Sequence, residues 1–354
     1  MEGWMAELRG NIASPDERAR MAARTRWNAV AKPIGSLGAL EAIIENIAAL
    51  GGTPDVDVGR RIVVVFCADN GVVAQGVSQC GSEITSLIAG SIAAGTSSVC
   101  KMAHAVRADA VSVDVGMATP SNVPGVINRR IAAGTADISI GPAMSRAQAV
   151  AAIRAGVEIA AWCKEQGYRI LAAGEMGIGN TTTASAMAAA FFGKPVAELV
   201  GRGAGLSSAG LERKRAAVGR ALAVNQPDPD DPLDVLAKLG GFDIAGMAGL
   251  FIGGAIHRLP VVIDGFISSI AAYTAVRLCP ESACAMFASH VSAEPAAGLP
   301  LEALGLRPIL HAGMHLGEGT GALCLFPLLD AALALYNGTT FEQAGMDAYE
   351  VGLA

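Results

Sequence analysis

The sequence predicts an α/β protein with a doubly wound, mainly parallel sheet. Residues 62–67 form a continuous β-branched run, which is typical of a strand buried on both faces. Ala- and Gly-rich helical stretches then alternate with further runs of this kind. Nearly all the predicted strands lead directly into a Gly with an acidic or small polar residue. Because ligands of open parallel sheets bind beyond the carboxyl ends of the strands, this pattern favours an enzyme with a small-molecule substrate.

The elements follow in order along the chain. The first fifty or so residues are predicted to be helical: Ser14 serves as N-cap, Pro15 takes the first helical position and a helix covers 18–30. A Pro- and Asp-rich segment, 225–232, predicts a linker between helices rather than a domain boundary, because helix signals resume at Leu233. Strands are predicted at 62–67, 110–115, 168–173, 260–263, 284–289 and 307–310.

Composition limits the classes of partner. The 354 residues are 52% hydrophobic and 16% charged, which is enough apolar material for a large core. A net charge of -6 without any dense Lys/Arg run argues against nucleic acid and anionic membrane as partners. The longest uncharged stretches, 84–100 and 176–193, are too polar for lipid-facing helices. The amino terminus shows no secretory signal, so we expect a cytoplasmic protein whose partners are small molecules.

Cysteine and histidine usage predicts neither disulfides nor a metal. The seven Cys include no CxxC pair, and an odd count without a signal peptide indicates reduced, mostly buried thiols. The five His show no HExxH and no Cys/His ligand spacing, and His311 and His315 lie in a Gly-rich loop rather than on a clear helix. We therefore expect no bound metal and no cofactor.

Segment 174–183 (GEMGIGNTTT) carries the first functional signal. A strand passes through glycines into an Ala-rich helix at 184–192, which leaves backbone N–H groups and hydroxyls at a positive helix end. That arrangement is typical of a phosphate cradle. It is neither a P-loop nor a GxGxxG fingerprint. The alternative is that the glycines only permit a tight turn and the threonines cap the helix.

Two further Gly-rich segments precede helices. In 313–321 (GMHLGEGTG), Glu318 stands among glycines before an apolar helix at 322–336, where Pro327 is expected to kink or tighten the start. Glu318 is either functional or simply an acid favoured by the helix dipole. Segment 201–210 leads into a helix that carries Lys214. A lone basic residue of this kind is usually solvated surface, but beside the glycines it could complete a site for a phosphorylated sugar.

Seven segments, taken together and in order, closely resemble the nicotinate-nucleotide:dimethylbenzimidazole phosphoribosyltransferase family. The similarity is collinear from about Lys32 to Met346, and the ordered set is highly specific although each segment alone is weak. It implies a homodimer with a Rossmann-like domain over 59–329 and a small helical domain made from 1–58 and 330–354. The segments are 32–41, 68–78, 174–183, 201–210, 240–245, 289–294 and 316–321.

The resemblance implies an enzyme of cobalamin biosynthesis. Such an enzyme moves the 5-phosphoribosyl group from nicotinate mononucleotide to 5,6-dimethylbenzimidazole, giving α-ribazole 5′-phosphate and nicotinate. Departure of the pyridinium ring leaves oxocarbenium character on the sugar and needs little acid assistance. The attacking imidazole, however, must lose a proton, and a carboxylate within hydrogen-bond reach can accept it, a role worth typically about 10²–10⁴-fold.

The resemblance also assigns residues. Glu318 is the implied base, and its charge can stabilise positive charge at C1′. Glu175 corresponds to a second carboxylate near the ribose and base, with a turn residue as the alternative. The implied phosphate and ribose contacts are Gly177, Asn180, Thr181 and Gly203, helped by Ser292 and Lys214. The implied contacts of the aromatic base are Ser78, Leu87 and Leu316.

Two positions depart from the family pattern. Leu87 stands where relatives tend to carry Gln, and Asn70 stands where His is frequent. Both fall near the expected base pocket, so a preference for dimethylbenzimidazole over adenine or other benzimidazoles stays open, and Leu87 could favour a differently shaped lower base. Two other functions are also weighed: a nucleotide-binding sensor without turnover, and a nucleotide N-glycosidase in which water replaces the azole.

Overall fold

The computed structural model describes residues 2–121 and 123–349. Within these residues six strands form one sheet, and each neighbouring pair is parallel. They are β1 (Arg61–Ala68), β2 (Ala108–Gly116), β3 (Ile127–Asn128), β4 (Ile170–Met176), β5 (Val261–Ile263) and β6 (Met286–Ala288). The order β3-β2-β1-β4-β5-β6 is that of a doubly wound sheet, and it reverses between β1 and β4. Ligands of such sheets bind beyond the strand ends at this reversal.

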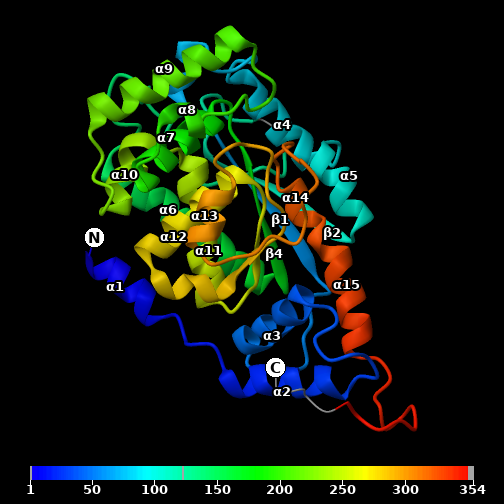
Figure 1. The fold of residues 1–354 in the computed structure, drawn as a ribbon. Helices are drawn as coiled ribbons and strands as arrows, with labels where there is room; N and C mark the ends of the chain where they lie inside the picture. Colours follow the sequence, from blue (N-terminus) through cyan, green and yellow to red (C-terminus); the bar gives the residue numbers. More distant parts are fainter. Residues whose placement is uncertain (1, 122, 350–354) are drawn as a thin grey trace.

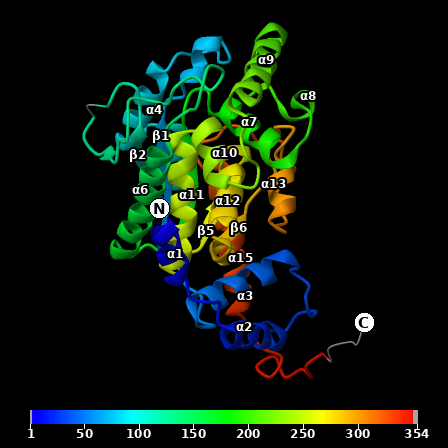
Figure 2. The ribbon, with the colours of Figure 1, turned by 90° about the vertical axis from the view of Figure 1, so that its left-hand side faces the viewer.

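Helices cover both faces of the sheet (Figure 1 and Figure 2). One face is covered by α6 (Arg146–Glu165), α7 (Asn180–Phe192), α9 (Ser208–Asn225), α10 (Pro232–Leu239), α11 (Phe242–Ile256), α12 (Phe266–Leu278) and α13 (Gly298–Ala303). The other face is covered by α4 (Glu83–Ala93), α5 (Ser98–Ala105), α14 (Thr320–Leu323) and α15 (Leu325–Tyr336). The remaining helices are α1 (Glu2–Gly10), α2 (Glu17–Ala29), α3 (Ala39–Gly51), α8 (Val196–Leu199) and the 3-10 turns η1 (Gly71–Gln75) and η2 (Pro280–Ala285).

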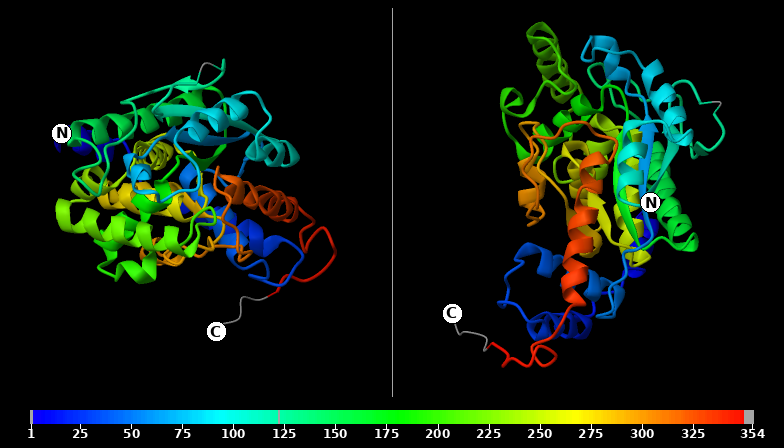
Figure 3. Two further views of the ribbon diagram at one scale, coloured as in Figure 1. Left: turned by 90° about the horizontal axis from the view of Figure 1, so that it is seen from above. Right: turned by 90° about the vertical axis from the view of Figure 1, so that its right-hand side faces the viewer.

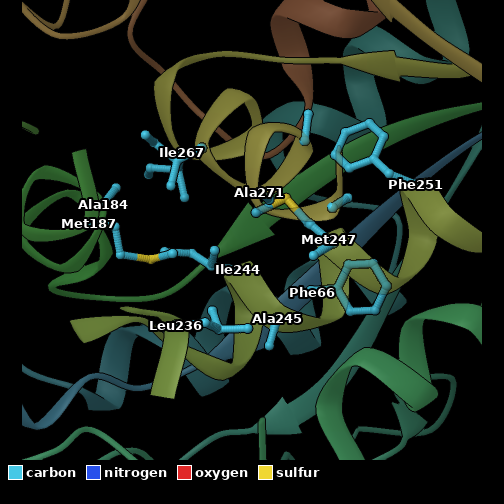
Figure 4. Packing of buried hydrophobic residues seen from close by; sticks show 14 of the residues in the cluster. Phe66, Ala184, Met187, Leu236, Ile244, Ala245, Met247, Phe251, Ile267 and Ala271 are labelled. Carbon is cyan, nitrogen blue, oxygen red and sulfur yellow. The ribbon is translucent and has the colours of Figure 1, made fainter. Parts of the chain in front are cut away.

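Strand β1 is the centre of the core. All eight of its residues are buried, and successive side chains enter opposite layers. Val64 and Phe66 pack with the α6–α13 layer, whereas Val63 and Val65 pack with the opposite layer. In Figure 4 the Phe66 ring lies among the side chains of α11, close to Met247. This two-sided burial explains why β1 is an unbroken apolar run in the sequence instead of an alternating one.

Helices α6 and α11 approach backbone to backbone. A Cβ atom on Gly249 would lie 1.9 Å from the Ile153 carbonyl oxygen, and one on Gly156 would lie 2.0 Å from that of Gly246. No side chain fits at either position. The contact fixes α11 on the sheet, and the N-terminal end of α11 is where Asp243 enters the site described below.

Helices α2 and α3 meet the C-terminal end of α15 in one helical unit below the sheet, while α1 lies apart from this unit (Figure 3). Val30 and Thr340 form an antiparallel bridge. The rings of Trp27 and Tyr336 pack edge to face with their centroids 4.9 Å apart, and the Tyr336 hydroxyl donates to the carbonyl oxygen of Pro54 at 2.9 Å. Residues from α2 and α15 therefore pack together, in a cluster that continues onto one face of the sheet.

Several expected elements are placed differently. Residues 307–310 form no strand, because only Leu310 makes a bridge, to His290. The last strand is shorter than 284–289, since η2 occupies the residues up to 285. Strand β3 was not anticipated, because two residues carry no recognisable periodicity.

Two helices begin at residues other than those predicted. Asp16, rather than Ser14, caps α2 by accepting from the N–H groups of Arg18 and Ala19, so Pro15 lies before the helix. Helix α7 begins at Asn180, four residues earlier than the Ala run at 184 indicated. Pro327 falls in the first turn of α15, just after the chain breaks from α14 at Cys324, as expected for a residue without an N–H.

The described residues, 2–121 and 123–349, contain neither a membrane span nor a metal-binding cluster. No helix there combines the length and apolar character that a membrane span requires. No group of three or more His, Cys, Asp or Glu side chains is arranged in that part of the chain to hold a metal ion.

Candidate active site

A cavity of about 260 Å³ lies beyond the carboxyl ends of β4, β5 and β6. Its walls come from loops that are far apart in the sequence, and three of these loops follow the neighbouring strands β4, β5 and β6. Both carboxylates singled out from the sequence, Glu175 and Glu318, line it. The lining residues belong to the segments 175–181, 203–204, 264–268, 290–294 and 314–321.

Glu318 has an unusual backbone conformation. Its φ of 59° lies in the left-handed region, between Gly317 at 84° and Gly319 at 81°. A residue with a side chain costs about 1–3 kcal/mol there unless its surroundings hold it in place. The surroundings do so here: a Cβ on Gly174 of β4 would lie 2.7 Å from the Glu318 carbonyl oxygen, so the strand and this loop pack directly against each other. The sheet therefore holds Glu318 in a strained position, which is typical of functional residues.

The side chain of Glu318 points to a helix start. Its Oε2 accepts from the N–H of Val99 at 3.3 Å, in the first turn of α5. Burial raises the pKa of Glu318, the Val99 N–H opposes that rise, and the charge of Asp264 adds to it. A carboxylate with raised proton affinity is better suited to accept a proton than an ordinary surface Glu.

Glu175 is the next-to-last residue of β4, and its carboxyl group is buried at the cavity wall. Its Oε2 accepts from Nδ2 of Asn180. Burial, followed by the charge of Asp243, raises the pKa of Glu175 well above its usual range. A Cβ on Gly317 would lie 2.7 Å from Glu175 Oε1, so the loop that carries Glu318 lies directly against this carboxyl group.

The segment from Gly177 into α7 forms another wall. A Cβ on Gly177 would lie 2.5 Å from the Ala68 carbonyl oxygen, and Gly179 has a φ of 91°. Both positions thus require glycine. Because α7 begins at Asn180, and Asn180 and Thr181 line the cavity, the positive end of this helix lies at the site.

Lys214 lies behind Thr181 and is not a solvated surface residue. It is fully buried, and Nζ donates to Thr181 Oγ1 at 2.8 Å and to the Gly201 carbonyl oxygen at 3.1 Å. Burial lowers the pKa of Lys214 to about 8, against the opposing charge of Glu294. Glu294 in turn accepts from the N–H of Gly203 at 2.9 Å through Oε1. Since the Thr181 hydroxyl accepts from Lys214, its own hydrogen remains available to a ligand.

The structure brings most of the sequence-predicted site residues to this cavity. Lys214 contacts it only through Thr181. Ser78 lines a smaller cavity of about 90 Å³, which shares Gly177 and Gly203 with the main one. Leu87, on α4, is 62% exposed and lines neither cavity. The predicted residues that do line the main cavity are Glu175, Gly177, Asn180, Thr181, Gly203, Ser292, Leu316 and Glu318.

Four residues at or behind the walls were not assigned a role from the sequence. Asp264 and His290 follow β5 and β6. Their positions just after predicted strands were the sequence feature that could have identified them as site residues. Glu294 lies in a segment that resembles the family, but no single pattern marks it. Asp243, buried at the start of α11, also lies in a segment that resembles the family, 240–245, but only the fold brings it to Asn180. Its Oδ2 accepts from Asn180 Nδ2 at 2.9 Å.

Comparisons with known proteins agree with this geometry. The family model described as "Phosphoribosyltransferase" matches residues 12–346. The nicotinate-nucleotide–dimethylbenzimidazole phosphoribosyltransferase of Ruminiclostridium cellulolyticum is 46% identical over 93% of this chain and 94% of its own length. The protein of the same name from Geobacter metallireducens is 43% identical over 97% and 98% of the two chains.

Solved structures extend the similarity to three dimensions. The crystal structure of CobT from Thermus thermophilus superposes with a TM-score of 0.88 at 41% identity, covering 93% of this chain and 99% of that one. Agreement in sequence and in fold over almost the whole length leaves no large region unaccounted for. The chain belongs to the nicotinate-nucleotide–dimethylbenzimidazole phosphoribosyltransferase family.

Proposed function

We propose that this protein transfers the 5-phosphoribosyl group of nicotinate mononucleotide to 5,6-dimethylbenzimidazole or a related lower base. The products are α-ribazole 5′-phosphate and nicotinate, in cobalamin biosynthesis. The observation that carries the proposal is that Glu175 and Glu318 share one cavity with the first turn of α7. The names of relatives that match over nearly the whole chain support the same reaction.

The phosphate of the nucleotide would bind at the start of α7. Helix N-termini favour anions through their unpaired N–H groups and their dipole. Thr181 offers a hydroxyl hydrogen, Gly203 and Ser292 lie on the same cavity, and Lys214 places a positive charge directly behind Thr181. Asn180 contributes differently, because its Nδ2 already donates to Glu175 and Asp243. We therefore propose that the Asn180 side chain mainly holds the two carboxyl groups in place, and that its Nδ2 does not bind the phosphate directly.

Glu318 would act as the general base. As the azole nitrogen attacks C1′, the bond from C1′ to the pyridinium nitrogen breaks and its electron pair leaves with nicotinate. The proton on the other azole nitrogen passes to Glu318. Its raised pKa and its position on a strained, sheet-supported loop support this role.

The lower base would lie toward Leu316 and Ser78. Leu316 lines the main cavity and is 59% exposed, while Ser78 lines the adjoining smaller one. The side chain of Leu87 is also exposed, so no other residue of the single chain covers it. We therefore propose a homodimer whose second copy covers these apolar side chains. Light scattering of the purified protein tests this assembly, and a monomer at enzymatic concentrations contradicts it.

We further propose the domain division 1–58 and 330–354 for the small helical domain and 59–329 for the catalytic domain. The bridge between Val30 and Thr340 and the contact of Trp27 with Tyr336 support the joining of the two segments, whereas α1 packs against the catalytic domain through Leu8 and Arg9. A cytoplasmic location stays a prediction from the sequence.

One experiment separates the proposed reaction from its alternatives. Purified protein is incubated with nicotinate mononucleotide and a panel of benzimidazoles, purines and phenols, and the products are identified by mass spectrometry. An α-ribosyl 5′-phosphate adduct of one base supports the transferase and identifies the lower base. Ribose 5-phosphate formed at full rate without any added base indicates an N-glycosidase, and binding without any product indicates a sensor.

A further inference from the structure

One amide nitrogen joins two buried carboxyl groups at the site. Nδ2 of Asn180 donates to Oε2 of Glu175 and to Oδ2 of Asp243, the latter at 2.9 Å. Glu175 lines the cavity, whereas Asp243, in the first turn of α11, is fully buried and does not. Asp243 therefore contacts the ligand side of the site from behind the wall, through Asn180 and Gly177.

The backbone around Asp243 leaves room for its carboxyl group. A Cβ on Gly177 would lie 2.7 Å from Asp243 Oδ2, and one on Gly241 would lie 2.3 Å from Oδ1. Side chains at either position would displace it. The glycine of the phosphate-binding segment thus also preserves the position of this acid.

The surroundings of the pair are acidic. Among the described residues no Lys or Arg forms an ion pair with Glu175 or Asp243. Two buried carboxylates bridged by a neutral amide cannot both hold a full charge at low cost, so one proton stays with the pair near neutral pH. The titratable groups that face the pair are Asp69, Asp264, Glu318 and the thiol of Cys67, with His290 beside Asp264.

Hydrogen bonds indicate which carboxyl group keeps the proton. Asp243 Oδ1 accepts from the N–H of Ile244 at 3.0 Å, at the positive start of α11, in addition to the Asn180 bond. Glu175 has Asn180 as its one side-chain partner in the described part of the chain. Burial raises the pKa of Asp243 to about 6 but raises that of Glu175 well above its usual range, so Asp243 ionises first.

We propose that Asp243 is a positioning residue whose charge, held beside Glu175 by the shared Asn180 amide, keeps Glu175 protonated, so that Glu175 meets the nucleotide as a hydrogen-bond donor. This inference rests on the proposed function and assigns opposite roles to the two carboxyl groups of one cavity. Glu318 works ionised as a base, while neutral Glu175 donates to an oxygen of the sugar phosphate. An ionised Glu175 would instead repel both the phosphate and Glu318.

The test is the pH dependence of nucleotide affinity, measured by calorimetry with nicotinate mononucleotide on the full chain. In the wild type the affinity falls as rising pH removes the proton from Glu175. Asp243→Asn removes the charge that holds this proton, so the fall moves to lower pH by about one unit or more. Glu175→Gln removes this fall, since an amide cannot ionise, and leaves only the fall near pH 8 that comes from Lys214. Asp230→Asn, at a side chain that is 98% exposed, is the matched control and leaves the midpoint where it is.

The same midpoint in Asp243→Asn and wild type overturns the inference. Should Asp243→Asn fail to fold, as judged by circular dichroism, infrared spectroscopy of the wild type and Glu175→Gln still decides. The wild type at neutral pH should show a protonated carboxyl band that Glu175→Gln lacks, and an unchanged band overturns the inference. A wild-type protein that does not bind the nucleotide at any pH contradicts the proposed function instead.

Discussion

Replacing Glu318 by Gln should abolish proton transfer while leaving the cavity intact. Gln has nearly the same size, keeps an oxygen that can accept from the Val99 N–H and meets the same left-handed backbone. Only the basic oxygen is lost. General-base catalysis contributes about 10²–10⁴-fold, so kcat should fall by that factor, which corresponds to about 3–5 kcal/mol in the barrier.

Stability should not fall with activity. Burial raises the pKa of Glu318 in the folded protein above its unfolded value, so the folded chain retains this proton to higher pH than the unfolded chain. Its contribution to stability is therefore fully present below the unfolded pKa and is lost as pH rises through the folded one. At neutral pH, Glu318→Gln should be as stable as the wild type or more stable.

Three measurements check this prediction. Product formation gives kcat and KM, calorimetry gives the affinity for nicotinate mononucleotide, and thermal unfolding gives Tm. Glu302→Gln, at an exposed position on α13, is the matched control. The reasoning is refuted if Glu318→Gln retains a kcat within about threefold of the wild type. A fall in affinity as large as the fall in kcat would show that Glu318 binds the nucleotide rather than accepts a proton.

Three further outcomes are expected. Gly177→Val should weaken nucleotide binding at least about tenfold, because its Cβ would lie 2.5 Å from the Ala68 carbonyl oxygen, and unaltered affinity by calorimetry would place the phosphate elsewhere. Nucleotide binding at pH 8 should take up a proton, because a bound phosphate raises the pKa of Lys214 from about 8; heats that do not vary between buffers of different ionisation enthalpy would contradict this. Between pH 4 and 7 the free energy of unfolding should lose about 3 kcal/mol from Asp243, whose pKa of about 6 exceeds the ordinary 3.8, and Asp243→Asn should flatten that slope in urea titrations.

Much of the fold was predictable because its signals are local. The apolar run at 62–67 lies within β1, and the strands at 110–115 and 260–263 were placed to within a few residues. The prediction of a strand at 307–310 was wrong. A short apolar stretch after a turn has the composition of a strand, but this segment has no neighbouring strand to pair with along its length. Helix α7 began early because Asn180 and the threonines, poor helix formers on their own, are held by tertiary contacts.

The candidate site divides in the same way. Glycine-rich loops identified Glu175 and Glu318, and the Glu175 loop follows β4 as predicted, whereas the strand expected before the Glu318 loop is absent. The burial of Lys214 behind Thr181 could not be predicted, because an isolated Lys on a helix is normally solvated. Asp243 could not be found either, since its partner Asn180 belongs to another helix.

The sequence by itself determined which chemical groups this protein has and the order in which strands and glycine loops present them, because backbone preferences and apolar periodicity act over a few residues. Only the tertiary structure decided which groups meet and in what state of charge. Burial of Glu175 and Asp243 around one amide, and the sheet that holds Glu318 at a φ of 59°, arise from packing between distant segments. Proton affinity depends on those neighbours and on exclusion of water, neither of which is a property of a residue alone.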